Sequence, residues 1–309
     1  MAGFYDKVKL RRGRCGYDES IAQHLTNVQP IIKAGGEVVG LVGGCNGLKV
    51  QEFPSSQIVV GSFSKFMNDG SNFELLDNNS IKEAYEKLSD ALHMDFTSAG
   101  VTQIEFGTQF LMVKPVHFYL IALGYLPDFT RLPISTTEEE TVYYKSGEAK
   151  VPPRMLKFYD KQREMARSGL NVPNGWENLL KYELTLTRRL NKRFGIERAS
   201  DLCDKRIYRR LAVVWQELYF KIEKQKQLNI NFSDMTTPKQ AKDTLFAILA
   251  AQNPEIVNNF IAELVKSGAL NRNRAYRFRQ MVGGLLKGAE QSERIKELDD
   301  AVKNAAAFV

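Results

Sequence analysis

Three strand-like segments carry tyrosine, lysine or carboxylate side chains in otherwise apolar surroundings. Glu105 lies in VTQIEFG, Tyr159 and Lys161 follow MLKF, and Glu183 lies in LLKYELTL. Burying an ionised carboxylate alone is costly, so each carboxylate should be paired with a cation or bound to a metal. Two such carboxylates meeting on adjacent strands would form an oxygen-rich site for Mg²⁺ or Mn²⁺.

The alternation of LLKYELTL predicts which of its side chains share a surface. Glu183 falls on the same face of the strand as Lys181 and Thr185, and the intervening apolar residues point to the other face. The carboxylates could therefore each pair with a neighbouring Lys or Arg and only stabilise the sheet. The spacing leaves both the metal site and the ion pair open.

Histidine and cysteine chemistry is poorly supported. The chain has only three histidines, and no two of them have metal-ligand spacing, which disfavours a histidine-bound zinc and a Ser-His-Asp triad. Its three cysteines are scattered and odd in number, which disfavours a disulfide framework and fits a reducing cytoplasm. Acid–base or metal chemistry would have to use carboxylates, lysine and tyrosine.

Basic residues are concentrated in three segments, 1–14, 181–210 and 272–279, in a chain of formal charge +7. The last segment interleaves arginines with Tyr276 and Phe278. Arginine neutralises phosphates and rings stack on bases, so this pattern favours a nucleic-acid partner, although solvated helix faces would give the same pattern. The side chains predicted to contact DNA are Arg188, Arg189, Lys192, Arg193, Arg272, Arg274, Arg277 and Arg279.

The 309 residues, 43% of them hydrophobic, suffice for a packed core, and no apolar stretch approaches the roughly 20 residues of a membrane span. Strand-like segments and the amphipathic helix 79–92 fill the chain to about residue 200, and helical patterns follow. We predict an α+β fold with a mostly antiparallel central sheet and packed helices. Residues 1–200 would form a catalytic domain, and residues 201–309 a helical region for DNA binding or oligomerisation.

An ordered set of segments between about residues 55 and 195 resembles the rolling-circle replication initiators of the Rep_trans and filamentous-phage types, in a Bacteroidetes-like branch. KFYDKQRE followed by LLKYELTLTRRL is similar to the family's Tyr-Asp/Asn-Lys strand and its later Glu strand. GSFSKFMNDGSNFELL, EAYEKLSDAL, VTQIEFGTQF and TVYYKS resemble the segments that precede them.

The resemblance implies that Tyr159 is the nucleophile, Glu105 and Glu183 are ligands of Mg²⁺ or Mn²⁺, and Lys161 is a cation near the phosphate. This sequence departs from the family at Gln103, where a basic residue is usual, and has Glu105 where Asp is usual. Lys181 likewise replaces Arg. Tyr143 and Tyr144 are rival nucleophiles on a neighbouring strand.

The function that this resemblance implies is metal-dependent nicking of one DNA strand at a replication origin. Tyrosine attack would form a 5′-phosphotyrosine link and free a 3′-hydroxyl, and the reverse reaction would rejoin the strand. The DNA partners would be the origin in single-stranded, hairpin and duplex form, and the protein partners would be a host helicase and polymerase. The protein would act in the bacterial cytoplasm without a membrane partner. A homodimer is possible. The alternatives are a non-catalytic DNA-binding replication accessory and a metal-dependent nuclease that uses water.

Overall fold

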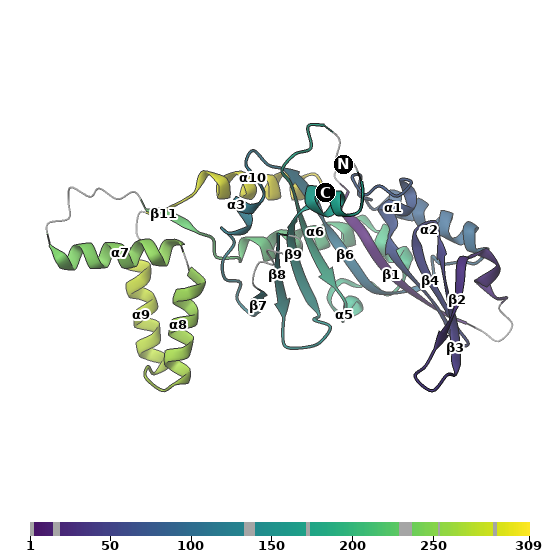
Figure 1. Cartoon of the computed structure of the whole chain (residues 1–309), viewed down its shortest axis with the longest axis horizontal. Coiled ribbons are helices and arrows are strands. Elements are labelled where there is room, and N and C mark those ends of the chain that lie inside the picture. The colour runs from purple at the N-terminus through teal and green to yellow at the C-terminus, as the bar shows by residue number, and fades with distance from the viewer. Residues whose placement is uncertain are drawn as a thin grey trace.

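Ten strands of the described chain form one antiparallel sheet in the order β2-β3-β4-β5-β1-β6-β10-β9-β8-β7 (Figure 1). The computed structural model describes residues 3–14, 19–132, 140–170, 174–228, 237–252, 254–286 and 289–309. The strands are β1 (Tyr5–Gly13), β2 (Thr26–Ile32), β3 (Val38–Cys45), β4 (Leu48–Phe53), β5 (Ser56–Ser62), β6 (Gly100–Leu111), β7 (Phe129–Leu132), β8 (Thr141–Ser146), β9 (Arg154–Asp160) and β10 (Leu179–Leu186).

Helices pack on one face of this sheet and bury the strand residues that point to that face, which form the core. Trp215 stacks on Tyr182 of β10 at 4.7 Å between ring centroids, and Tyr182 stacks on Phe158 of β9 at 4.2 Å. The helices are α1 (Phe63–Met67), α2 (Ser80–Leu92), α3 (His117–Leu120), α4 (Lys161–Arg167), α5 (Leu190–Phe194), α6 (Lys205–Phe220), α7 (Pro238–Gln252), α8 (Pro254–Lys266), α9 (Arg272–Leu285) and α10 (Glu293–Ala307), with 3-10 helices η1 (Ile21–His24) and η2 (Ala199–Cys203).

The opposite face of the sheet carries the polar residues of the same strands. We call it the polar face. The alternation predicted for LLKYELTL is confirmed, since Tyr182 lies in the core and Lys181 contacts Glu183 on the other side. The polar-face residues used below are Asp6 and Lys7 of β1, Gln103, Glu105 and Gln109 of β6, Tyr143 of β8, Lys157 and Tyr159 of β9, and Lys181, Glu183 and Thr185 of β10.

The C-terminal third both completes the core and forms a separate projection. α6 and α10 contribute Trp215 and Val302 to the same buried cluster as the strands, beyond the boundary predicted at residue 200. Between them, β11 (Lys226–Leu228) pairs antiparallel with β12 (Ala289–Gln291). Helices α7, α8 and α9 lie between these two strands in the chain and project from the body; we call them the three-helix unit (Figure 1).

The predicted α+β class is confirmed, and so are the helical patterns after residue 204. α3 is short and ends at Leu120. Beyond it the backbone bonds another segment instead: Gly124 N–H donates to the Glu223 carbonyl at 2.8 Å. Among the described helices, none is long and apolar enough to cross a membrane.

Candidate active site on the polar face

Tyr159 lies near the end of β9 with its ring on the polar face. Its hydroxyl donates a hydrogen bond to Glu183 Oε1 at 3.2 Å. The antiparallel register of β9 and β10 places Tyr159 opposite Lys181 and Lys157 opposite Glu183. The strand pairing therefore joins the predicted nucleophile to one of the two predicted metal ligands.

Lys181 holds the centre of this cluster together. Its Nζ lies 2.8 Å from Glu183 Oε1 and also contacts Asp6, which comes from β1. Asp6 accepts further hydrogen bonds from Ser62 at 2.5 Å and Asn72 at 3.2 Å. Burial disfavours the ammonium, but Asp6 and Glu183 outweigh it and raise the pKa of Lys181 well above its ordinary value. Lys181 is therefore a permanently charged, fully buried cation.

The environment of Tyr159 keeps its hydroxyl protonated. The side chain is buried, and burial raises its pKa well above the ordinary value. Lys181 opposes that rise, while the charges of Glu183 and Asp6 add to it. A phenol held in this state can act as a nucleophile only when a base takes its proton, and Glu183 is already within hydrogen-bonding distance.

Glu105 lies beside Glu183 on the next strand, β6. The register places Glu105 opposite Thr185 and Gly107 opposite Glu183. Burial first, and then the charges of Glu183 and Asp6, raise the pKa of Glu105 to about 7, although Lys7 at 3.6 Å lowers it. The two predicted ligands thus lie close enough for their charges to influence each other.

The chemistry of this pair of carboxylates fits a hard divalent cation. Glu105 and Glu183 offer carboxylate oxygens, which Mg²⁺ and Mn²⁺ prefer. No group of three or more His, Cys, Asp or Glu side chains placed to hold a metal occurs in the described part of the chain. Mg²⁺ commonly keeps several waters and takes phosphate oxygens as ligands, so two carboxylates can suffice. A cation held there would withdraw charge from a bound phosphate.

Lys161 is buried and paired with a carboxylate of its own helix. It is the first residue of α4, its side chain is 1% exposed, and its Nζ lies 2.5 Å from Glu164. Burial and the charge of Lys181 lower its pKa, against the effect of Glu164. Its charge is largely balanced by Glu164, so Lys161 stays a predicted phosphate contact without a geometric argument in its favour.

Lys157 is the cation that sequence reasoning missed. Its Nζ lies 4.0 Å from the centroid of the Tyr159 ring and 5.8 Å from that of Tyr143. The signal was present in MLKFYD, where Lys157 and Tyr159 are two residues apart and so share a strand face. Lys157 stands on the polar face beside both tyrosines.

The two rival tyrosines, Tyr143 and Tyr144, lie on opposite faces of the sheet. Tyr144 is fully buried in the core, and its hydroxyl donates to the Gly124 carbonyl at 2.7 Å. Tyr143 lies on the polar face, half-buried, in register with Lys157. Tyr143 is therefore the rival to Tyr159 that has access to the same surface.

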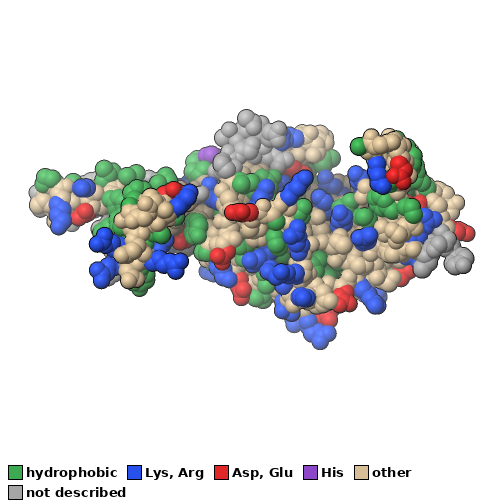
Figure 2. All heavy atoms as spheres, turned by 90° about the horizontal axis from the view of Figure 1, so that it is seen from below, with side chains coloured by type: hydrophobic (Ala, Val, Ile, Leu, Met, Phe, Trp, Pro, Cys, Tyr) green, Lys and Arg blue, Asp and Glu red, His purple; other side chains and the backbone are tan. Residues whose placement is uncertain are grey.

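The predicted DNA contacts fall into two groups on different parts of the molecule. Arg188 and Arg189 are exposed directly after β10, and Lys192 and Arg193 belong to α5. The four arginines of α9 are all exposed on the three-helix unit. Seen from below, Lys and Arg side chains gather both on the underside of the body and on the projecting unit (Figure 2).

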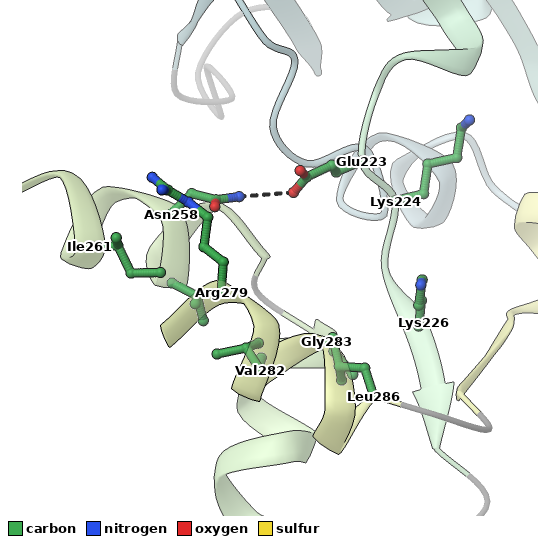
Figure 3. Close-up of a pocket in the computed structure, with 12 residues that line it drawn as sticks. Glu223, Lys224, Lys226, Asn258, Ile261, Arg279, Val282, Gly283 and Leu286 are labelled. Atoms are coloured by element: carbon green, nitrogen blue, oxygen red, sulfur yellow. Dashed lines mark hydrogen bonds between the residues drawn. The ribbon is translucent and has the colours of Figure 1, made fainter. Parts of the chain in front are cut away.

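A pocket of about 350 Å³ lies where the three-helix unit meets β11 and the segment that precedes it. Figure 3 shows Ile261, Val282 and Leu286 on its apolar side and Arg279 reaching toward Glu223 and Asn258. Asn258 donates a hydrogen bond to Glu223 at 2.9 Å, which ties α8 to the segment after α6. The pocket is thus part of the junction between body and unit.

Comparison with known proteins does not assign this site. A scan of the sequence against models of protein families finds no match, and a search of curated proteins also finds none.

The acid stability of the protein is expected to depend on Asp6. Burial alone would raise the pKa of Asp6, but the charge and hydrogen bond of Lys181 lower it to about 2 from 3.8. A lowered folded pKa gives stability that is present above pH 4 and is lost as the pH falls toward 2. The stability advantage of wild type over Asp6→Asn should shrink by about 2 kcal/mol between pH 5 and pH 2. Urea unfolding at several pH values measures it, and a pH-independent difference would contradict the pairing.

Proposed function

We propose that this protein is a DNA strand-nicking and strand-joining enzyme, a rolling-circle replication initiator whose nucleophile is Tyr159. One observation carries the proposal: the Tyr159 hydroxyl bonds Glu183, which the buried cation Lys181 holds in place, on the polar face of the sheet. The tyrosine, the carboxylate that accepts its hydrogen bond and the cation that holds this carboxylate therefore lie together on one face of the sheet. The resemblance of the surrounding segments points to the same residue.

The chain's own groups support each part of the first step. The Tyr159 oxygen attacks the phosphorus as its proton passes to Glu183, and the bond from phosphorus to the 3′ oxygen breaks. The leaving 3′ oxygen takes up a proton, so the net transfer runs from the tyrosine hydroxyl to the new 3′-hydroxyl. The products are a 5′-phosphotyrosine and a free 3′ end. Reversing the same steps rejoins the strand.

Positive charge near the attacked phosphate would come from Lys157, while Lys181 stays paired with Asp6 and Glu183. Lys157 Nζ lies over the Tyr159 ring, and Lys181 contacts the carboxylate that accepts the tyrosine proton. Fixed cations of this kind stabilise the charge that develops on phosphate oxygens in the transition state. Glu105 and Glu183 would hold Mg²⁺ or Mn²⁺.

The two basic groups would divide the DNA between them. The group after β10 belongs to the body that carries Tyr159, and the arginines of α9 belong to the unit that projects from it. A helix fits the major groove of duplex DNA, so α9 is the candidate for duplex or hairpin contact. The free 3′-hydroxyl would be extended by a host polymerase, aided by a host helicase, in the bacterial cytoplasm.

Binding of duplex DNA is expected to lose part of its salt dependence when α9 loses charge. Each phosphate contact contributes about 0.9 to the slope of log affinity against log salt. Arg274→Gln with Arg277→Gln should therefore lower the slope by about 2. Fluorescence anisotropy over a range of KCl concentrations measures it. Lys266→Gln, an exposed α8 lysine paired with Glu263, is the matched control, and an unchanged slope in the double variant would contradict α9 contact.

Covalent trapping tests the proposed function against its alternatives. The protein is incubated with a labelled library of single-stranded oligonucleotides and Mg²⁺ or Mn²⁺, and the products are separated on a denaturing protein gel. A slower, labelled protein band is the expected result. Cleavage without that band would identify a nuclease that uses water, and binding without either product would identify a DNA-binding accessory.

A further inference from the structure

An exposed aromatic pair stands at the rim of the polar face. Trp176 lies in the loop before β10 and is 39% exposed, a large apolar surface left in contact with solvent. Its ring meets the half-buried ring of Phe73 edge-on, with 5.4 Å between the centroids and 63° between the planes. The two aromatics come from segments about a hundred residues apart in the sequence, so the fold assembles this pair.

Hydrogen bonds fix both loops to the site. Gln109 Nε2 donates to the Phe73 carbonyl at 2.6 Å, and the neighbouring Asn72 donates to Asp6 at 3.2 Å. On the other loop, the Asn178 carbonyl accepts from Met112 N–H at 3.1 Å, just beyond the end of β6. One of these hydrogen bonds, from Asn72 to Asp6, connects the Phe73 loop to the carboxylate that also contacts Lys181.

The register of three strands places this pair close to the nucleophile. Tyr159 is opposite Lys181 and Lys181 is opposite Gln109, so the three residues form one row across β9, β10 and β6. Neighbouring strands lie about 4.8 Å apart, so the row spans roughly 10 Å. Gln109 Oε1 is buried and has no hydrogen-bond partner among the described residues.

We propose that Trp176 and Phe73 form a stacking platform for an unpaired nucleobase in the strand that Tyr159 cuts. An exposed indole gives a base one π-face, which stacking uses without regard to base identity. A base inside a duplex already stacks on both neighbours and would have to be extruded, so the platform selects single-stranded DNA at the cleavage point. This inference rests on the proposed function, because it assumes that Tyr159 cuts a DNA strand, and it adds that the cut strand is unpaired.

The two tryptophans of the chain make the platform directly measurable. Trp215 is fully buried in the core, whereas Trp176 is exposed, so quenching of fluorescence by added DNA reports on Trp176. Titration of the full-length protein with single-stranded oligonucleotides is expected to quench its emission, and a duplex of equal length should quench it much less. Trp176→Phe should remove the quenched component. Trp176→Ala should weaken binding of single strands about tenfold to a hundredfold.

Phe118→Ala is the matched control, because Phe118 is also exposed, at 41%, but belongs to α3. It should bind single strands as wild type does, and near-ultraviolet circular dichroism checks that each variant is folded. Unchanged affinity in Trp176→Ala, or equal quenching by duplex, would overturn the platform. If Trp176→Ala forms the adduct and binds DNA with wild-type affinity, the stacking platform is contradicted and the proposed function is supported. If DNA quenches the fluorescence but no adduct forms, the platform is supported and the proposed function is contradicted.

Discussion

Tyr159→Phe is expected to abolish the covalent DNA–protein band, lowering its rate of formation at least a thousandfold. The substitution removes one oxygen atom and leaves the ring between Lys157 and the sheet, so the fold should be preserved. Without that oxygen no phosphotyrosine can form at this position. The rate is measured from the labelled band on a denaturing gel over time, with single-stranded DNA and Mg²⁺ or Mn²⁺.

Tyr143→Phe is the matched control for that experiment. Tyr143 shares the polar face and lies near the same lysine, but its hydroxyl has no hydrogen bond to Glu183 in the structure, where Tyr159 fills that place. Adduct formation should stay within about tenfold of wild type, an allowance for a lost surface contact near the DNA. Loss of the band in Tyr143→Phe with retention in Tyr159→Phe would assign the nucleophile to β8 instead.

Lys181→Met is expected to destabilise the fold by about 3–5 kcal/mol. Methionine has a similar length but no charge, so Asp6 and Glu183 would be left buried without their shared cation. Removing one partner of a buried ion pair costs more than the pair itself contributes, because the remaining charge stays desolvated. Urea unfolding at pH 7 measures the change in the free energy of unfolding.

Two further variants show whether that loss comes from the buried charges. The triple variant Asp6→Asn, Lys181→Met, Glu183→Gln removes all three charges together and should recover much of the stability lost in Lys181→Met. Lys192→Met, at an exposed lysine of α5, should change the free energy of unfolding by less than about 0.5 kcal/mol. A loss below about 1 kcal/mol in Lys181→Met would show that the cluster is hydrated rather than buried.

Periodicity was enough to predict the side of the sheet on which the site lies. The alternation of LLKYELTL placed Lys181 and Glu183 together, and the structure confirms both that pairing and the burial of Tyr182. Local spacing also contained Lys157, which shares a face with Tyr159 and could have been found by the same rule. Strand periodicity is strong evidence because one register error would move every core residue of the strand to the other face of the sheet.

The long-range partners could not be predicted in this way. Asp6 precedes Lys181 by 175 residues and reaches it because β1 has a register irregularity between Tyr5 and Val8. No local pattern announces that irregularity. The contact of Lys161 with Glu164 depends on a helix, α4, in a segment whose sequence showed only high charge.

The three-helix unit illustrates the same limit at a larger scale. The sequence predicts helical patterns throughout this region, and each of its three helices is present. Their position as an insertion depends on β11 and β12, two strands of three residues that lie about sixty residues apart in the sequence. Strands so short carry too few residues to show a period, so the sequence indicated a continuous helical region instead.

Mass spectrometry of the trapped adduct tests the central claim most directly. After nuclease treatment and trypsin digestion, Tyr159 lies in the peptide 158–161, bounded by Lys157 and Lys161, whereas Tyr143 lies in a peptide that ends at Lys145. The account predicts a nucleotide phosphate attached to Tyr159 in the first peptide. A modification on Tyr143, or cleaved DNA with both peptides unmodified, would contradict it.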